Sequence, residues 1–302
     1  MNFNVGDTAS FRRILTQEDF NRFAALSWDD NPIHCDPVFA AKSHFGGTVS
    51  HGMLLYSVLS KGFSELIPGP GAIQLEQEMM HPNGTYTGEE CVWTITVKAV
   101  NPDGTLELAT VISKASDPAN IKHQGRARVA PCGVKPEFAN APAAPAIQQE
   151  GDGYLYGLKP GMFKEKKRTF NAADLTEYGN LSGDRNPLFR EKEFAQDAGF
   201  KDVIVPWPLH AGMFSDMLGT DLPGRGTGWM KQKLIYKSAA YLGEELTARV
   251  EIIRLRADKE LVNLRSTIVG ADGRLICDGE SLVLVRNLED KEDKSGKFPI
   301  AA

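Results

Sequence analysis

The sequence predicts an α+β protein made of two copies of one unit, in which a buried helix is followed by antiparallel strands that curl around it. Three observations lead to this prediction: a segment that occurs twice, a helix that is apolar on most faces, and short strand-like segments separated by turns. The chain has 302 residues, with 42% apolar and 24% charged residues, as expected for a globular protein with two ordinary domains. The formal charge of −5 gives no general attraction to nucleic acid, so we expect no nucleic-acid partner.

The repeated segment lies near the start of each half. Residues 23–40 read FAALSWDDNPIHCDPVFA, and residues 178–195 read YGNLSGDRNPLFREKEFA. Asp29 corresponds to Asp184, a spacing of 155 residues (184 − 29 = 155). Repeats of this kind indicate a duplicated structural unit.

The spacing of the repeat changes along the chain. Gly52-Met53 matches Gly212-Met213 at a spacing of 160, which predicts an insert at residues 205–208 of the second copy. The spacing returns to 155 where residues 88–90 match residues 243–245. Because chance rarely restores a lost spacing, the match supports a duplication.

The duplication predicts three segments. Residues 1–130 form the N-terminal domain, residues 131–153 form a linker rich in Ala, Pro, Gln and Gly, and residues 154–302 form the C-terminal domain. Two such units could pair side by side into one continuous sheet.

Each unit is predicted to contain two helices before its strands. Thr16 is expected to cap a short helix in the first copy, and Asn171 does the same in the second. A longer helix starts near His51 and runs to about Leu66, and its apolar faces predict burial. The strands that follow are expected at residues 91–100, 105–113 and 124–129, and at residues 246–256, 261–269 and 275–285.

The sequence carries no sign of secretion, a membrane span or a bound metal. The N-terminal residues lack the basic and apolar regions of a signal peptide, and no apolar run approaches the roughly 20 residues that a membrane helix needs. The four cysteines are widely spaced and form no metal-binding motif with histidine. We therefore expect a cytoplasmic protein with reduced thiols, no membrane partner, no metal and no cofactor.

The first copy of the repeat resembles the signature of a known family. That signature has an aromatic, an aliphatic and a small residue, then Gly-Asp-x-Asn-Pro-aliphatic-His, five spacers and Ala or Ser; the matching residues here are Phe23, Leu26, Ser27, Asp29, Asn31, Pro32, Ile33, His34 and Ala40. Trp28 stands where Gly is usual. The chain resembles the MaoC-like or hydratase-2 family of (R)-specific enoyl-CoA hydratases, in a tandem, double hot-dog arrangement.

The resemblance implies that Asp29 and His34 form an acid–base pair acting on one water, with Asn31 holding the loop. Pro32 disfavours a helical conformation at Asn31, so this loop should be extended there and could aim both side chains at that water. Gly52, at the start of the buried helix, would offer a backbone N–H to the thioester oxygen. The same residues also fit simpler roles, since Asp-Asp-Asn-Pro is a common turn and a helix-entry glycine often only packs closely.

Further residues of the family pattern lie along the long helix and in the second copy. In the family, a serine at the position of Ser60 supports the catalytic aspartate. His51 and Met53 are our candidates for contacts with substrate, although His51 also suits a purely structural role at the helix start.

The second copy keeps the aspartate of the motif but has Phe189 where the histidine is required. It shows no clear counterpart of Ser60. We therefore expect its chemistry to be lost, with Asp184 structural, and Phe189 and Trp207 shaping a pocket for the acyl tail.

Other polar clusters have ordinary explanations. We expect His44, His81, His123 and His210 to be surface or structural residues. The basic cluster at residues 164–168 could contact CoA phosphates, but a solvated edge strand is the more common structure for such a run.

The resulting functional prediction is an (R)-specific 2-enoyl-CoA hydratase or 3-hydroxyacyl-CoA dehydratase, acting on acyl-CoA thioesters. Two alternatives stay open: a 3-hydroxyacyl-ACP dehydratase of fatty-acid synthesis, which would use the same residues, and a non-catalytic protein that binds acyl thioesters. The tandem chain already contains a pair of units, and we expect it to form a homodimer of such chains.

Overall fold

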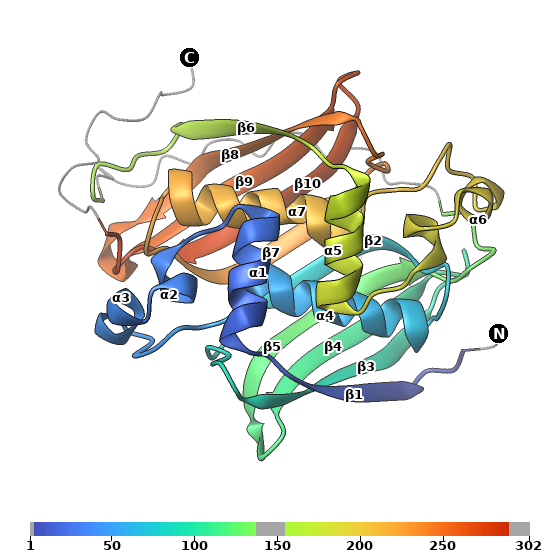
Figure 1. The fold of residues 1–302 in the computed structure, drawn as a ribbon, viewed down its shortest axis with the longest axis horizontal. Coiled ribbons are helices and arrows are strands. Elements are labelled where there is room, and N and C mark those ends of the chain that lie inside the picture. Colours follow the sequence, from blue (N-terminus) through green and yellow to red (C-terminus); the bar gives the residue numbers. More distant parts are fainter. Residues whose placement is uncertain (1–2, 137–154, 290–302) are drawn as a thin grey trace.

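The computed structural model describes residues 3–136 and 155–289, which form one large antiparallel sheet with helices on one face (Figure 1). The sheet has ten strands in the order β1-β3-β4-β5-β2-β7-β10-β9-β8-β6. The strands of the first half are β1 (Thr8–Ile14), β2 (Ile73–Met80), β3 (Glu90–Val100), β4 (Leu106–Lys114) and β5 (Asp117–Ala130). Those of the second half are β6 (Phe163–Thr169), β7 (Gly228–Tyr236), β8 (Glu245–Arg256), β9 (Leu261–Gly270) and β10 (Leu275–Leu284).

The two halves join at the centre of this sheet. β2 pairs antiparallel with β7, with Glu76 opposite Ile235 and Met80 opposite Lys231. The strand order on one side of this seam repeats on the other, as a duplicated chain with an approximate twofold relation requires. The predicted antiparallel architecture and the continuous sheet are therefore confirmed, while β1, β2 and β7 add to the strands expected from the sequence.

Two buried helices lie between the sheet and an outer pair of helices. The inner pair is α4 (Gly52–Glu65) and α7 (Trp207–Asp216), which continues as a π-helical turn η2 (Met217–Asp221), and the outer pair is α1 (Gln17–Ser27) and α5 (Ala172–Ser182). The inner helices pack against each other, and α1 contacts α7 while α5 contacts α4. This crosswise packing brings residues from both halves to each end of the helix layer (Figure 1).

The helix starts follow the expected chemistry. The Thr16 hydroxyl accepts the N–H of Asp19, whose carboxylate accepts the N–H of Thr16, and Asn171 and Asp174 repeat this capping box in α5. The remaining short helices are α2 (Pro32–Cys35), α3 (Pro37–Lys42), η1 (Pro187–Phe189), α6 (Lys192–Asp197) and η3 (Ala257–Lys259). None of the helices in the described part of the chain is long and apolar enough to cross a membrane.

The spacing between the copies is 155 throughout this region, so the predicted insert at residues 205–208 was wrong. The isolated bridge between Val49 and Tyr86 recurs between Ile204 and Tyr241, and both pairs are 155 residues apart (204 − 49 and 241 − 86). The first residue of α4 is Gly52 and that of α7 is Trp207, again 155 apart. The match between Gly52 and Gly212 was accidental.

A constant spacing of 155 changes which residue of α7 corresponds to each residue of α4. Trp207 takes the place of Gly52, and Ser215 takes the place of Ser60 (215 − 60 = 155). The second copy therefore does have a counterpart of Ser60. The predicted linker lies mostly in residues 137–154, outside the described residues, so its bounds stay a prediction.

Candidate active site

The loop after α1 places Asp29 and His34 on the same side. Trp28 ends α1 in the left-handed conformation (φ 72°), the conformation that Gly183 takes in the second copy. Asn31 then caps α2, in which Pro32 is the first residue and His34 the third. The backbone at Asn31 has a ψ of 126° before its proline, so the loop is extended there as expected.

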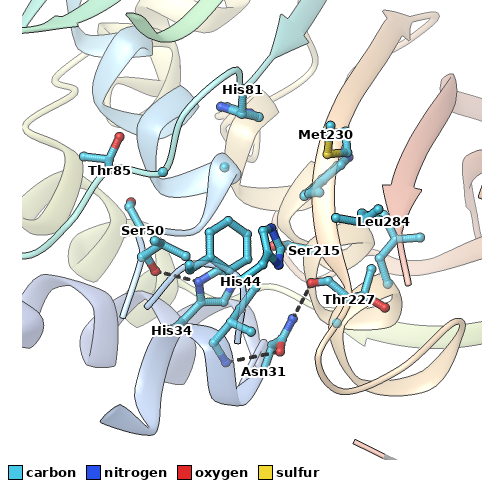
Figure 2. A pocket seen from close by; sticks show the side chains of 18 of the residues that line it. Asn31, His34, His44, Ser50, His81, Thr85, Ser215, Thr227, Met230 and Leu284 are labelled. Carbon is cyan, nitrogen blue, oxygen red and sulfur yellow. Dashed lines mark hydrogen bonds between the residues drawn. The ribbon is translucent and has the colours of Figure 1, made fainter. Parts of the chain in front are cut away.

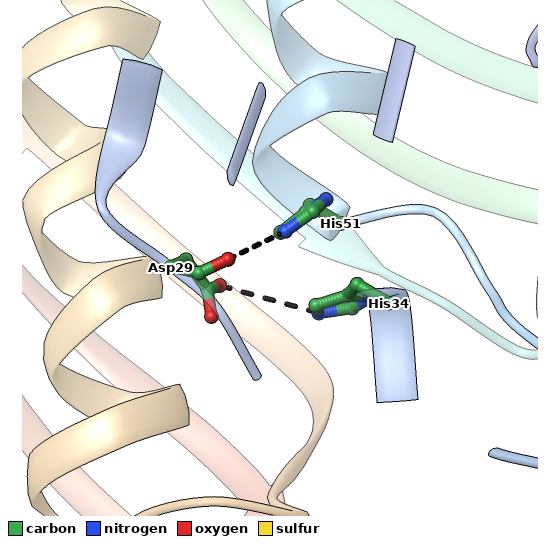
Figure 3. A group of neighbouring side chains, drawn as sticks. All are labelled: Asp29, His34 and His51. Atoms are coloured by element: carbon green, nitrogen blue, oxygen red, sulfur yellow. Dashed lines mark hydrogen bonds and ion pairs between the residues drawn. The ribbon is translucent and has the colours of Figure 1, made fainter. Parts of the chain in front are cut away.

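Asp29 and His34 face each other across a short gap (Figure 3). The His34 Nε2 atom lies 4.0 Å from Asp29 Oδ2. The Nδ1 atom of His34 lies 2.7 Å from the carbonyl oxygen of Val49, and because a carbonyl only accepts, Nδ1 carries the proton. The unprotonated Nε2 atom of the neutral ring therefore points its lone pair towards the carboxylate.

Burial shifts the pKa values of both groups away from their charged forms. Desolvation raises the pKa of Asp29 from 3.8 to about 7, against the hydrogen bonds from Ser215 and from the N–H of Asn31, which lower it. Desolvation lowers the pKa of His34 from 6.5 to about 4. At neutral pH the imidazole is therefore uncharged, and Asp29 is close to the midpoint of its titration.

The support for Asp29 comes from the other half of the chain. Ser215 on α7 donates its hydroxyl to Asp29 Oδ2 at 2.6 Å. Ser60, which was expected to support this carboxylate, donates instead to Asp184 Oδ2 at 2.6 Å. The expected role of Ser60 was therefore wrong, because α4 and α7 cross and each serine reaches the aspartate of the opposite copy.

Asn31 holds the loop against the second half. Its side-chain amide donates to the carbonyl of Thr227 at 2.9 Å, and its side-chain oxygen accepts the N–H of Gly226 at 2.9 Å. The backbone N–H of Asn31 donates to Asp29 Oδ1 at 3.2 Å. Asn31 thus positions Asp29, as the sequence predicted, through contacts nearly 200 residues away.

Asp29 and His34 line a pocket of about 530 Å³ that lies between the two halves. Its walls come from the motif loop, the segment 81–86, the end of α7 and strands of the second half; they include Asn31, Ser50, Gly52, Ser215, Gly219, Met230 and Leu284 (Figure 2). Lys259 and Arg286 also line it. The pocket therefore combines two groups that can act as acid or base, Asp29 and His34, with apolar surface that could contact an acyl chain.

Gly52 lies in this wall at the first turn of α4. The N–H of the first residue of a helix has no acceptor within the helix, so the Gly52 N–H could bind an oxygen. A Cβ atom on Gly52 would lie 2.8 Å from Nε2 of His81, which leaves no room for a side chain. The close packing of His81 accounts for a glycine here, and the approach of a thioester to Gly52 stays a prediction.

Two histidines were missed as pocket residues. His44 and His81 both line the cavity, although the sequence suggested only surface or structural roles. His81 is buried against Gly52, and burial lowers its pKa to about 4. Neither residue belongs to the motif, and the turn that carries His81 follows a strand that the sequence analysis did not predict.

His51 and Met53 have structural positions. The His51 Nε2 atom lies 3.0 Å from the carbonyl oxygen of Asp29, and its ring stacks on that of His34 with centroids 3.8 Å apart. Met53 is fully buried in the core. Neither is among the residues that line the pocket, so the expected substrate contacts are replaced by support of the loop.

Asp29, His34 and His51 offer potential metal-ligand atoms within 4.8 Å of one another. The expectation from cysteine and histidine spacing did not include this group. One nitrogen of each ring is already bound to a backbone carbonyl.

The second copy has lost its cavity at the equivalent point. Phe189 replaces His34, Trp207 replaces Gly52, and their rings pack edge to face with centroids 5.6 Å apart. Both are buried, and neither lines the pocket around Asp29. The proposed role of Phe189 and Trp207 in shaping the acyl pocket is therefore not supported; they fill the site of their own copy.

The basic cluster at the start of the second half has structural partners. Lys166 pairs with Asp216 at 2.7 Å and with Asp221 at 2.8 Å. The buried Arg168 donates to the carbonyl of Leu26 at 2.6 Å, at the end of α1. The cluster lies on the edge strand β6, as the simpler interpretation predicted.

Comparison with known proteins shows the family of this chain. Residues 4–114 match the model of the MaoC like domain. The (R)-specific enoyl-CoA hydratase of Aeromonas caviae is 36% identical over 126 residues, which cover 42% of this chain and 94% of that protein. This chain belongs to the MaoC-like family. A second MaoC-like relative, the mitochondrial 3-hydroxyacyl-[acyl-carrier-protein] dehydratase of Solanum lycopersicum, is 33% identical and aligns with 43% of this chain and 79% of its own length.

Solved structures confirm the fold over nearly the whole chain. A protein of Mycobacterium tuberculosis described as having a double hotdog fold superposes with a TM-score of 0.72 and 13% identity, covering 93% of this chain and 96% of the other. A MaoC-like dehydratase superposes with a TM-score of 0.70 and 16% identity, covering 93% and 98%. The double hot-dog prediction is therefore confirmed for this MaoC-like protein.

Proposed function

We propose that this protein is an (R)-specific 2-enoyl-CoA hydratase, which in reverse dehydrates 3-hydroxyacyl-CoA. The observation that carries the proposal is the pair Asp29 and His34, buried in a pocket with Oδ2 and Nε2 4.0 Å apart. That separation is too long for a direct hydrogen bond and suits one water bound to both atoms. Named relatives with this activity support the choice of reaction.

The water donates one hydrogen to each acceptor, which leaves a lone pair of its oxygen free to attack C3 of the enoyl group. Asp29 takes the proton, because a base with a pKa of about 7 is better matched to neutral pH than His34 with a pKa of about 4. The O–C3 bond forms as the electrons of the C2–C3 double bond move into the thioester. His34 keeps the water oriented.

The negative charge that develops on the thioester oxygen needs a donor. The candidate is the backbone N–H of Gly52, which lines the cavity at the N-terminus of α4, where the partial charge is positive. The protonated Asp29 then returns its proton to C2. Because hydroxyl and proton arrive from the same side, the addition is syn, and the relatives' names imply the (R)-3-hydroxyacyl product.

The test is hydration of crotonyl-CoA, followed by loss of the ultraviolet absorbance of the conjugated thioester. Asp29→Asn and His34→Ala should each lower kcat by about 10²–10⁴-fold in a folded protein. Asp184→Asn is the matched control, since Asp184 occupies the same loop position beside Phe189 and should leave turnover on this short substrate nearly unchanged. Near-native kcat in the Asp29 or His34 variant, or an (S) product, would overturn the proposal.

A 3-hydroxyacyl-ACP dehydratase is the second candidate. Relatives with that name and the cationic Lys259 and Arg286 beside the pocket favour it, because a carrier protein is acidic. Comparing kcat/KM for the same acyl group on CoA and on carrier protein separates the two. A non-catalytic role is disfavoured by the intact Asp29 and His34, whereas the homodimer and the cytoplasmic location stay predictions.

A further inference from the structure

A second cavity opens in the other half of the molecule. It has a volume of about 400 Å³ and is lined by Ile73, Lys135, Pro136, Ala198, Gly199, Phe200, Lys201, Ser238, Ala239, Tyr241 and Arg274. These residues come from the start of β2, the segment after β5, the loop after α6, the segment after β7 and the turn between β9 and β10. The cavity therefore lies near the motif loop of the second copy.

The second cavity corresponds to the mouth of the catalytic pocket. Five of its positions are exactly 155 residues after positions that line the first pocket: Gly199 after His44, Phe200 after Phe45, Ser238 after Asn83, Ala239 after Gly84, and Tyr241 after Tyr86. The duplication has thus kept the outer part of the cavity in both copies.

Only the inner part of the second cavity has been closed. Phe189 and Trp207 are 4% and 1% exposed and occupy the positions of His34 and Gly52. An acyl thioester therefore cannot reach Asp184, which is itself buried and bound by Ser60. Any ligand of this mouth is bound without being converted.

The charge of the second mouth differs from that of the first. Three of its lining residues are cationic, and none of the described residues that line it carries a carboxylate. Lys201 stands where the first copy has Gly46 (201 − 46 = 155), and Arg274 lies in the turn between β9 and β10. At residue 201 the second copy therefore carries a positive charge that the first copy lacks.

These cations are held in defined positions. The Lys201 ammonium lies 4.2 Å from the ring centroid of Tyr241. Arg274 binds the Ser238 hydroxyl at 3.1 Å and pairs with Glu244 at 2.7 Å and with Asp272 at 2.5 Å, so its guanidinium is fixed beside the cavity. A phosphate group suits Lys and Arg side chains that line one cavity.

We propose that this second mouth is a non-catalytic binding site for the phosphorylated adenine nucleotide that CoA carries. The choice of ligand rests on the proposed function. The pocket around Asp29 would then bind acyl-CoA for reaction, and the second mouth would bind CoA or a nucleotide with the same phosphates. CoA bound at the second mouth would not compete with the substrate that binds beside Asp29, so the occupancy of this mouth would follow the concentration of free CoA.

The number of CoA molecules bound per chain tests the proposal. Equilibrium dialysis of the full chain against CoA should give two sites in the wild type and one in Lys201→Glu, whose affinity at the second site should fall on the order of tenfold or more. Lys98→Glu on β3 is the matched control, since Lys98 is exposed and lines neither cavity. This control should retain two sites.

The same samples separate this inference from the proposed function. Adenosine 3′,5′-bisphosphate in place of CoA shows whether the nucleotide alone suffices, and its binding at the Lys201-dependent site supports the proposal. One site in both wild type and Lys201→Glu overturns it, even if crotonyl-CoA is hydrated. Two sites with no hydration would leave the inference standing and refute the proposed activity.

Discussion

The two motif loops provide a controlled comparison of one carboxylate in two environments. In both loops the aspartate accepts a backbone N–H from the asparagine two residues later and a serine hydroxyl at 2.6 Å from the opposite helix. Asp184 additionally accepts the hydroxyl of Tyr178 at 3.4 Å. Phe23 takes the position of Tyr178 in the first copy (178 − 23 = 155), so Asp29 lacks this donor.

The substitution Phe23→Tyr should therefore lower the pKa of Asp29. A hydrogen bond to a charged group contributes about 1.5–3 kcal/mol, and the long contact seen for Tyr178 suggests the lower end. Since one pKa unit corresponds to about 1.4 kcal/mol, the pKa of Asp29 should fall by about one unit from its value of about 7.

The pH dependence of kcat/KM for crotonyl-CoA hydration measures this shift, because it reports the pKa of the free enzyme. The midpoint of the fall in kcat/KM on the acid side should move about one pH unit lower. At pH 6, kcat/KM as a fraction of its maximum should therefore rise about fivefold. Tyr178→Phe is the matched control and should leave this midpoint in place. An unchanged midpoint in Phe23→Tyr, or an equal shift in Tyr178→Phe, would refute the assignment of Asp29 as the base.

Three further predictions concern the contacts around the two aspartates. Ser215→Ala should lower kcat/KM at pH 7 by on the order of tenfold, because Asp29 loses a hydroxyl donor, whereas Ser60→Ala should change kinetics little and lower the free energy of unfolding instead; equal kinetic losses would contradict the crossed arrangement. Burial raises the pKa of Asp29 from 3.8 to about 7, so the folded state holds this proton more tightly, and above pH 7 it contains a buried charge. Asp29→Asn should then raise the free energy of unfolding at pH 8 by up to about 4 kcal/mol, and urea unfolding should show the gain shrinking to nothing towards pH 4. Trp207→Ala should lower the free energy of unfolding by about 3–5 kcal/mol, with Trp207→Phe milder, and leave the ratio of hexenoyl-CoA to crotonyl-CoA rates unchanged; an altered ratio would return Trp207 to the acyl pocket.

The sequence was sufficient for residues whose function depends on local spacing. Asp29, Asn31 and His34 lie within six residues, and the motif alone indicated their role. The caps at Thr16 and Asn171 were predicted for the same reason, since a capping box needs only four consecutive residues.

Contacts between the halves could not be read from the sequence. Ser215 reaches Asp29 across 186 residues, and this contact depends on how α4 and α7 cross above the sheet. Correct alignment of the copies would have located Ser215. Aligning Gly52-Met53 with the identical pair Gly212-Met213 concealed it, because most of α7 is apolar and offers few distinctive residues for alignment.

The divergence of the two copies explains why the same loop is catalytic in one half and structural in the other. Four positions around each carboxylate differ: Phe23 and Tyr178, His34 and Phe189, Gly52 and Trp207, and Gly219 and Ser64. The first copy has fewer hydroxyl donors and less side-chain volume at these positions than the second. Asp29 is therefore buried but lines a cavity, and its pKa is about 7. In the second copy these positions add donors and aromatic volume, so Asp184 is saturated with hydrogen bonds and sealed. A buried carboxylate acts as a base only where some of its lone pairs are left for water, and this chain maintains that condition at Asp29 and abolishes it at Asp184.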